Sequence, residues 1–479
     1  MTWFDFRDLH FILTLNRIAM PLPTSTPELR ALDAAHHLHP FSDMKSLNAE
    51  GARVIVKAEG VWLTDSNGNR ILDGMSGLWC VNVGYGRVEI VEAVRAQMME
   101  LPYYNTFFKT THKPAIQLAA KLAKLTPPQF SKVFFTGSGS ESNDTVIRMV
   151  RRYFDIKQQP KKKVIISRRN AYHGSTVGAA SLGGMAPMHE QGGLPIPDIV
   201  HIAQPYWWGE ARQGETPEEF GLRTARALES TIDALGEDRI AAFIAEPVQG
   251  AGGVIIPPST YWPEIARICR ERDILFISDE VICGFGRTGN WFGCETFDTQ
   301  PDILVMAKGI TSGYMPLGAV MVADRVAETL LEGGDFNHGY TYSGHPAACA
   351  AAIANLDIMI NEKIVERVAE DVGPYLAARW RALAEHPLVG EAPMIGLVGA
   401  LELTPDKVGR TKFPDVGKVG TMARDFSFQN GLVMRAVRDR LIIAPPLTIS
   451  HGEIDELVAR ARKTLDDTYG ALRRQGWVA

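Results

Sequence analysis

Two ionisable residues follow apolar segments in a way that can build a site for chemistry. Lys308 comes directly after the apolar run 303–306 and one alanine, and Asp279 ends a run that begins at Ile274. A lysine at the end of a buried strand loses hydration, which lowers its pKa and makes the amine a nucleophile able to form an imine. An aspartate at the end of a neighbouring strand can hold a buried cation, such as a protonated ring nitrogen. Each residue alone is also compatible with an ordinary charged strand end.

A segment of small residues is suited to hold a phosphate. Residues 137–144 read Gly-Ser-Gly-Ser-Glu-Ser-Asn-Asp and lie between the apolar run 133–135 and a helical pattern over 145–154. A helix that opens this way offers free N–H groups and a positive dipole end. Gly139 lets the backbone approach an anion, and Ser138 and Ser140 add hydroxyl donors. The same segment could also be an ordinary helix N-capping sequence that binds no ligand.

Three further features fit a flat, phosphorylated, ring-shaped cofactor. Tyr172 can stack on an aromatic ring, with His173 fixing the local geometry, although such a pair is also common in protein cores. Glu246 ends another apolar run, directly before a glycine-rich loop. Because the carboxyl ends of parallel strands face the ligand crevice, Glu246, Asp279 and Lys308 are expected to converge. Together with the phosphate loop, these residues predict a site for pyridoxal phosphate (PLP).

The elements that position these residues are predicted from the apolar pattern. Short, continuous apolar runs between helical patterns indicate strands buried on both faces, and hence a mostly parallel α/β sheet of seven strands in one large domain. The runs are 133–135, 164–166, 199–202, 241–245, 274–277, 303–306 and 319–322.

The pattern changes at both ends of the chain. Residues 347–360 predict an alanine-rich helix and 397–403 a strand, whereas 61–73 predict a β-hairpin with its turn at Asn67-Gly68. We therefore expect a smaller α+β domain built from both chain ends. The expected boundaries are a poorly ordered leader over 1–28, an N-terminal part of the small domain over 29–79, a large domain over 80–345, and a C-terminal part over 346–479.

Composition excludes several classes of function. The chain has 479 residues, a net charge of −5 and 22% charged residues, and neither a basic surplus nor a polybasic run points to nucleic acid or a membrane surface. No apolar stretch approaches the roughly 20 residues that span a bilayer. Five scattered cysteines without a CxxC pair argue against a disulfide framework and for a reducing cytoplasm. The acidic N-terminus is unlike an export signal.

Two motifs are misleading. Residues 65–70 superficially resemble a calcium loop, but Arg70 stands where that loop needs glycine, so no metal site is expected. Residues 284–289 match GxGxxG and follow a strand. The residues after them do not start an amphipathic helix, and Asp279 and Glu280 would sit beside a bound pyrophosphate. We interpret this segment as a loop and not as a dinucleotide fingerprint.

In combination, these motifs resemble the class III (ω-) aminotransferases of PLP fold type I, and most closely the bacterial amine:pyruvate transaminases. The resemblance runs from about Leu29 to the C-terminus. It is carried by segments 77–87, 103–108, 138–141, 172–174, 245–247, 278–281, 307–309 and 340–346, and by Arg435.

The resemblance implies a role for each matching residue. Lys308 would form the Schiff base with the cofactor and move the proton during catalysis, and Asp279 would hold the pyridinium nitrogen. The remaining implied residues bind the cofactor or the substrate. The ring would lie between Tyr172 and Val281, the phosphate would contact Gly139, Ser140 and Thr341 of a second subunit, and the substrate pocket would include Trp79, Phe107, Tyr172 and Arg435.

The implied reaction moves the amino group of a primary amine to pyruvate, giving an aldehyde or ketone and L-alanine. The amine is left open among diamines, polyamines, ω-amino acids and aryl-alkyl amines. The chain is expected to form a homodimer or a dimer of dimers, because Thr341 would complete the partner's site. Three alternatives remain: 2-oxoglutarate as acceptor, a related PLP aminomutase or decarboxylase, and a PLP-binding regulator. The last lacks the basic DNA-binding segment that it would need before residue 60.

Overall fold

The computed structural model describes residues 24–478, which form two compact units. One unit consists of the described residues up to Ala58 together with Trp62–Ile71, and the other of Glu59–Val61 and the described residues from Leu72 onward. Most of the expected leader lies outside the described residues, but residues 26–28 form the first turn of a helix. The finer domain boundaries expected from the sequence stay predictions.

The first unit pairs two helices with a small sheet. Its elements are α2 (Thr26–His36), α3 (Met44–Glu50) and the three-stranded sheet β1 (Ile55–Glu59), β2 (Trp62–Asp65) and β3 (Arg70–Leu72). The predicted hairpin is confirmed. Gly68 donates its N–H to the carbonyl of Asp65 at 3.0 Å and has a φ of +83°, which glycine adopts without strain.

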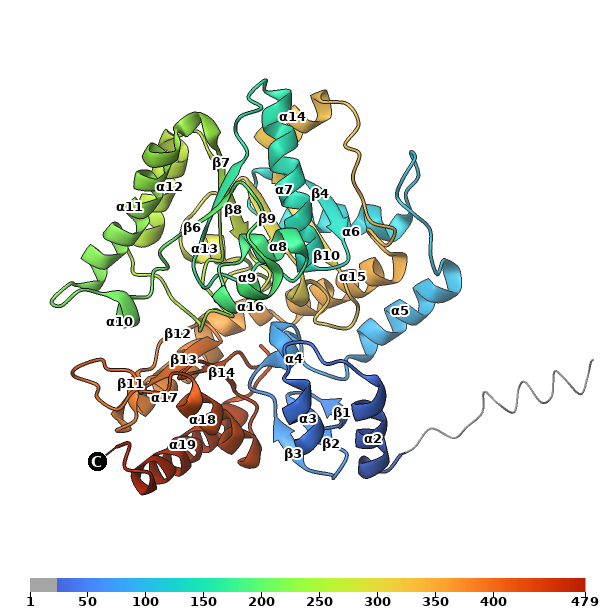
Figure 1. Ribbon diagram of the computed structural model, residues 1–479. Helices are drawn as coiled ribbons and strands as arrows, with labels where there is room; N and C mark the ends of the chain where they lie inside the picture. The colour runs from blue at the N-terminus through green and yellow to red at the C-terminus, as the bar shows by residue number, and fades with distance from the viewer. Residues whose placement is uncertain (1–23, 479) are drawn as a thin grey trace, which may run out of the picture. The chain divides into compact units, whose positions relative to one another are not determined.

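The second unit is built on a seven-stranded sheet in the order β4-β10-β9-β8-β7-β5-β6 (Figure 1). All pairs among β5 to β9 are parallel, as predicted, whereas β10 runs antiparallel to both of its neighbours. A loop without a long crossover helix joins β9 to β10, which permits antiparallel pairing. The strands are β4 (Phe130–Thr136), β5 (Val164–Arg168), β6 (Ile199–Ile202), β7 (Ile240–Ala245), β8 (Leu275–Asp279), β9 (Ile303–Met306) and β10 (Gly318–Ala323).

Helices cover both faces of this sheet, which explains why its strands are continuously apolar (Figure 1). On one face α7 (Gly139–Ile156), α8 (Val177–Leu182) and α14 (Asp324–Glu332) pack against alternate strand residues. On the other face α11 (Pro217–Leu235) and α12 (Tyr261–Glu271) cover the intervening residues. The sheet is therefore a rigid central layer whose strand ends are fixed in space.

The C-terminal part adds a second sheet and several helices. The predicted helix is α15 (Pro346–Asn361), and the predicted strand is β13 (Val398–Leu403) at the centre of the order β11-β13-β15-β14. The other strands are β11 (Val389–Glu391), β12 (Met394–Ile395), β14 (Arg435–Val437) and β15 (Arg440–Ile443). The helices here are α16 (Ile364–Arg367), α17 (Gly373–Ala382), α18 (Lys418–Gln429) and α19 (His451–Arg474).

Six more helices connect the remaining segments of the described chain. They are α4 (Ser76–Trp79), α5 (Val88–Glu100), α6 (Lys113–Leu125), α9 (Ala186–Gly192), α10 (Trp207–Glu210) and α13 (Gly293–Thr296). Across residues 24–478, no helix combines the length and the apolar character that crossing a bilayer requires.

The GxGxxG segment is a loop that seats a buried arginine. Residues 281–290 form turns, and the fully buried Arg287 donates to the carbonyl of Pro445 at 2.5 Å and to Asn82 Oδ1 at 2.9 Å. Burial lowers the pKa of Arg287 to about 10. The glycines are closely packed by other residues: a Cβ added to Gly284 would lie 2.7 Å from the carbonyl oxygen of Glu280, and one added to Gly286 would lie 3.0 Å from Leu447 Cδ1.

Candidate active site

A cavity of about 400 Å³ opens at the carboxyl ends of the parallel strands, within the size range of small-molecule sites. Its wall is formed by the loops that follow β4, β5, β7, β8 and β9. The cavity is lined by these residues predicted from the sequence: Ser138, Gly139, Ser140, Tyr172, His173, Glu246, Asp279, Val281 and Lys308.

Three neighbouring strands bring the charged groups together. Glu246 follows the end of β7, Asp279 is the last residue of β8, and Lys308 lies two residues beyond β9. The pairing of Ala245 with Ser278, and of Asp279 with Val305, aligns the three strand ends in register. The convergence expected from the sequence is therefore a direct result of parallel pairing.

Lys308 is held in an unusual backbone conformation. Its φ is +49°, in the left-handed region that residues with a Cβ rarely adopt. Burial lowers the pKa of the Lys308 amine, while the negative charge of Asp279 opposes this shift. A lysine with a lowered pKa is more often neutral, and the neutral amine is the nucleophile.

The Asp279 carboxylate is fixed by three donors inside the protein. Asn143 Nδ2 and His173 Nδ1 both donate to Asp279 Oδ2, at 2.9 and 2.7 Å, and the N–H of Val281 donates to Oδ1 at 3.1 Å. Asn143 Nδ2 also donates to the carbonyl of His173 at 2.7 Å. Since Asn143, His173 and Asp279 are at most 3% exposed, this network keeps one orientation.

The N-terminus of α7 forms the anion-binding end of the cavity. Ser138 caps the helix by accepting the N–H of Glu141 at 3.2 Å, and the Ser140 hydroxyl accepts the N–H of Ser175 at 3.0 Å. The loop is closely packed, because a Cβ added to Gly139 would lie 3.0 Å from Val281 Cγ2. The helix end thus presents free N–H groups and a positive dipole to the cavity.

Glu246 acts as a structural support beneath Tyr172. Its carboxylate accepts the N–H of Tyr172 at 3.1 Å and the N–H of Gly250 at 2.9 Å. Burial raises the pKa of Glu246, whereas the charges of His173 and Arg168 lower it. Glu246 therefore joins the loops after β5 and β7 and fixes the backbone at Tyr172.

The donor set fits PLP. The helix N-terminus suits a phosphate, the anchored carboxylate of Asp279 suits a protonated ring nitrogen, and the amine of Lys308 suits an aldehyde. Val281 and Leu317 add apolar surface to the same cavity. Each end of the cavity therefore matches the chemistry of one end of the cofactor.

Arg435 lies within electrostatic reach of the same cavity. Arg435 is the first residue of β14 and is half-buried. Its positive charge lowers the pKa of Lys308, and the charge of Tyr172 raises the pKa of Arg435. Burial lowers the pKa of Arg435. In the part of the chain that the structure describes, its guanidinium forms no ion pair, so it is available to an anionic ligand.

Besides Arg435, three predicted residues do not line this cavity in the single chain. Trp79 is 2% exposed and packs in an apolar cluster with Ile282, which does line the cavity. Phe107 lines a separate hollow of about 440 Å³ together with Phe134. Thr341 is exposed, and its carbonyl accepts the hydroxyl of Tyr103 at 2.7 Å. Their proposed substrate and phosphate contacts stay predictions.

Several residues that shape the site were not predicted from the sequence. Asn143 follows Ser140 by one helical turn, a spacing that could have placed it on the face of α7 toward Asp279. Thr311, Met315 and Leu317 line the cavity from the loop between β9 and β10, which has no periodic pattern to reveal them.

Comparisons with known proteins agree with this geometry. Residues 45–465 match the family model described as aminotransferase class III. The chain is 58% identical over 447 residues to the putrescine–pyruvate aminotransferase of Pseudomonas aeruginosa, covering 93% of this chain and 98% of that protein.

Two solved structures share the fold. The (S)-enantioselective omega-transaminase of Thermomicrobium roseum is 46% identical, with a TM-score of 0.90 over 93% of this chain and 99% of that chain. The omega transaminase of Pseudomonas jessenii in complex with PMP is 40% identical, with a TM-score of 0.91 over 92% of this chain and 98% of that chain.

Proposed function

We propose, since this chain belongs to the class III aminotransferases and so uses PLP, that it transfers the amino group of a primary amine to pyruvate. The products are an aldehyde or ketone and L-alanine. The naming of the Pseudomonas aeruginosa relative as a putrescine–pyruvate aminotransferase supports pyruvate as acceptor and a diamine among the donors.

One observation carries the proposed chemistry. Glu246, Asp279 and Lys308 come from three adjacent strand ends and face one cavity, which also contains the N-terminus of α7. A structural role for any one of these residues is easily imagined. Their convergence on a cavity with an anion-binding end is what amino-group transfer through PLP needs.

Different residues of the chain have different roles in the proposed reaction. PLP supplies an electron sink for the carbon that loses its proton. Lys308 can take that proton and return it, because its pKa is lowered and its amine faces the cavity. Asp279 keeps a ring nitrogen protonated, while Asn143 and His173 keep Asp279 in place.

The proposed role of Arg435 is to bind the carboxylate of pyruvate and alanine. The same pocket must also accept an amine that has no carboxylate. A guanidinium that is half-buried and lacks an ion pair in the described structure can pair with an incoming carboxylate. We assign Trp79 and Phe107 to the substrate pocket and Thr341 to the phosphate site across a subunit interface.

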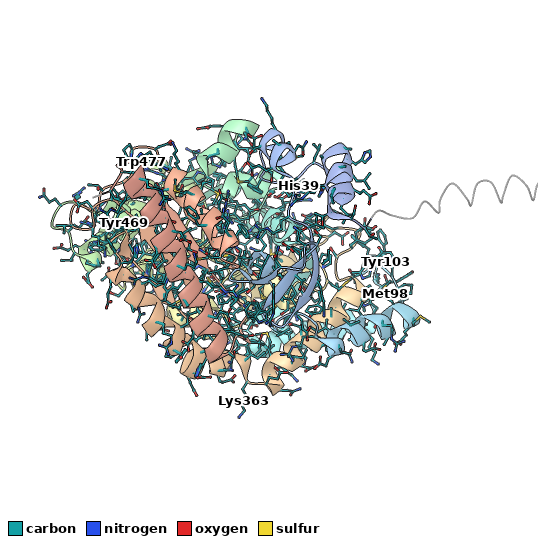
Figure 2. The ribbon with its side chains drawn as sticks, turned by 90° about the horizontal axis from the view of Figure 1, so that it is seen from below. His39, Met98, Tyr103, Lys363, Tyr469 and Trp477 are labelled. Carbon is teal, nitrogen blue, oxygen red and sulfur yellow. The ribbon has the colours of Figure 1, made fainter. Side chains whose placement is uncertain are left out.

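We also propose a homodimer, or a dimer of dimers, in the cytoplasm. All five cysteines are free, which supports a reducing compartment. Exposed apolar side chains on and after α5 support a subunit interface, and Figure 2 labels two residues of this region, Met98 and Tyr103.

A donor panel tests the proposed function. Purified holoenzyme is incubated with putrescine, spermidine, β-alanine, γ-aminobutyrate or 1-phenylethylamine, in each case with pyruvate or with 2-oxoglutarate. We expect alanine to accumulate with at least one primary amine. Glutamate formation from 2-oxoglutarate without alanine formation would assign the alternative acceptor. Turnover that needs no keto acid would indicate an aminomutase or decarboxylase.

Lys308 is tested separately by chemical trapping. Borohydride reduction of the holoenzyme followed by peptide mapping should place the pyridoxyl group on Lys308, and Lys308→Ala should abolish turnover. Lys109 and Lys132 serve as internal controls, because neither lines the cavity. Recovery of the label on either of them would refute the assignment of Lys308.

A further inference from the structure

A cluster of imidazole and carboxylate groups lies at the end of α2, in the N-terminal unit. Asp33 is in the last turns of the helix and His37 is its C-terminal cap, four residues later. Residues four apart in a helix lie on the same face. His39 follows after one intervening residue, and Figure 2 labels it on this segment.

The three side chains point their ligand atoms at one another. His37 Nδ1 lies 3.1 Å from Asp33 Oδ1, and His39 Nε2 lies 2.9 Å from both carboxylate oxygens of Asp33. The two imidazole rings are 4.0 Å apart between centroids. One ligand atom from each residue lies within 4.8 Å of the other two.

These spacings match a metal centre. A zinc ion bound by histidine nitrogen and carboxylate oxygen has ligand distances of about 2.0–2.2 Å. Ligands at that radius and at right-angle or tetrahedral positions lie roughly 3 to 3.5 Å from one another. The distances from Asp33 to the two histidines are those of hydrogen bonds, and they are also compatible with a shared ion.

The charges favour a cation at the same point. A single carboxylate faces two imidazole rings, so the three residues present one anionic oxygen and two ring nitrogens to a cation. The side chains of Asp33, His37 and His39 are 21%, 60% and 22% exposed, so an ion can enter from solvent.

We propose that Asp33, His37 and His39 bind a divalent transition-metal ion, such as Zn²⁺, with water at the remaining positions. Two nitrogen ligands and one oxygen ligand suit Zn²⁺, Ni²⁺ or Co²⁺ better than Ca²⁺ or Mg²⁺, which prefer oxygen. Such an ion ties the end of α2 to the segment after it, and it is distinct from the PLP site.

No metal site was expected from the sequence, because these residues do not form a known motif. His36-His37-Leu38-His39 has none of the spacings of a known zinc motif, and Asp33 becomes a neighbour only because the helix places it one turn away. The structure brings the three residues together without a recognisable sequence signature.

Equilibrium dialysis of the full-length holoenzyme against Zn²⁺ tests the site. We expect the wild type to bind one more ion per chain than Asp33→Asn, His37→Ala and His39→Ala, each of which should weaken binding at that site at least tenfold. His36→Ala is the matched control, because His36 is exposed and adjacent but outside the cluster. It should bind like the wild type.

Two outcomes would overturn the proposal. One is equal Zn²⁺ binding by the wild type and the three ligand variants, which would leave the residues as a hydrogen-bonded trio only. The other is an equal loss in His36→Ala, which would indicate non-specific binding by a histidine-rich segment. Co²⁺ loading adds an independent measurement, since its visible absorption should change on binding to the wild type and not to His39→Ala. Circular dichroism of each variant checks that the fold is intact.

Discussion

The carboxylate of Asp279 owes its orientation to two neighbouring side chains, one of which, Asn143, does not line the cavity. Two side chains, Asn143 and His173, donate to the same oxygen, and both are buried. A hydrogen bond to a charged group contributes about 1.5–3 kcal/mol, so losing one donor has a measurable effect. Asn143 is therefore a positioning residue, whereas Asp279 and Lys308 face the cavity itself.

Asn143→Ala should weaken PLP binding and slow turnover, each by roughly 10- to 150-fold, because Asp279 loses one of its donors. The pH dependence of the bound cofactor's absorption should also shift, which a purely structural defect would not cause. Equilibrium dialysis of PLP and a spectroscopic titration measure both effects. Ser142→Ala is the control: its hydroxyl contacts Thr136 and Ser138, not Asp279. Unchanged cofactor spectra in Asn143→Ala would disprove the positioning role.

Arg435→Ala should affect one half-reaction more than the other. A bidentate contact between guanidinium and carboxylate contributes about 1.5–3 kcal/mol, which corresponds to roughly 10- to 150-fold. The reactions with pyruvate and alanine should weaken by that factor, and the half-reaction with an uncharged aryl-alkyl amine should change much less. Stopped-flow kinetics separate the two.

Arg438→Ala is the matched control for Arg435, since Arg438 is exposed and three residues away. It should leave both half-reactions near the wild-type rates. Equal losses in both half-reactions for Arg435→Ala would remove this residue from carboxylate recognition.

Among individual residues, the groups attached to strand ends were predictable from the sequence, whereas those presented by helix faces and loops were not. Lys308, Asp279 and Glu246 are predictable because a strand end fixes where the next side chain points. Asn143 contacts Asp279 across 136 positions of the chain, and no local pattern encodes such a distance. Trp79 and Phe107 were placed by family resemblance alone, and the single chain does not bring them to the cavity.

At the scale of elements, the strands of the large sheet were all predictable, since each is a continuous apolar run covered on both faces by helices. The antiparallel direction of β10 was not, because apolar runs carry no information about strand direction. The C-terminal sheet was predicted only in part, since β11, β12 and β14 are two or three residues long. Such strands depend on tertiary pairing and not on a pattern of their own.

One buried carboxyl links two elements and predicts a pH-dependent stability. Glu280 follows β8 and accepts the N–H groups of Gly293 and Cys294 at the start of α13, both at 2.7 Å. Burial raises the pKa of Glu280 from 4.5 to about 7. The folded state therefore binds this proton more tightly than the unfolded state. The resulting stabilisation is present below pH 4.5 and is lost as the pH rises to about 7.

The urea concentration at the unfolding midpoint of the holoenzyme should accordingly decrease as the pH is raised from 5 to 8. Glu280 should account for up to about 3 kcal/mol of this loss in the free energy of unfolding. In Glu280→Gln, the part of this pH-dependent decrease that is due to Glu280 should disappear. The variant should also be less stable than the wild type at pH 5, because its amide group faces a backbone N–H. Glu332→Gln at the exposed end of α14 is the control and should keep the wild-type pH dependence. If Glu280→Gln lost as much stability between pH 5 and pH 8 as the wild type, the proposed titration of Glu280 would be contradicted.

At the scale of the whole molecule, the surface around Tyr103 points to assembly. Met99, Phe108 and Tyr342 are 81%, 92% and 65% exposed, and the rings of Tyr103 and Tyr342 pack 5.9 Å apart. Large exposed apolar side chains in one region are typical of a subunit interface. Thr341 lies in this region and outside the cavity of its own chain, as a residue donated to a partner's site would.

Mixed dimers can test the donation of Thr341. Lys308→Ala and Thr341→Ala chains are combined by unfolding and refolding, or by co-expression with two tags. If Thr341 completes the partner's site, the mixed dimer contains one site with both Lys308 and Thr341 intact. Its PLP affinity and turnover at that site should then equal those of a wild-type site. The proposed assembly would be contradicted if the PLP affinity and turnover of the mixed dimer were no higher than those of Thr341→Ala alone. It would also be contradicted if light scattering showed that a monomer is fully active.

The origin of the site's parts has a consequence for how such an enzyme can change. The groups that face the cofactor are attached to the ends of one rigid sheet, whereas the proposed substrate residues Trp79, Phe107 and Arg435 come from α4, a loop and β14. Substitutions confined to those three segments, whether natural or from a laboratory library, can change which amine is accepted. They leave the residues that carry out the reaction unchanged. The fold thereby separates the evolution of preference from the evolution of mechanism.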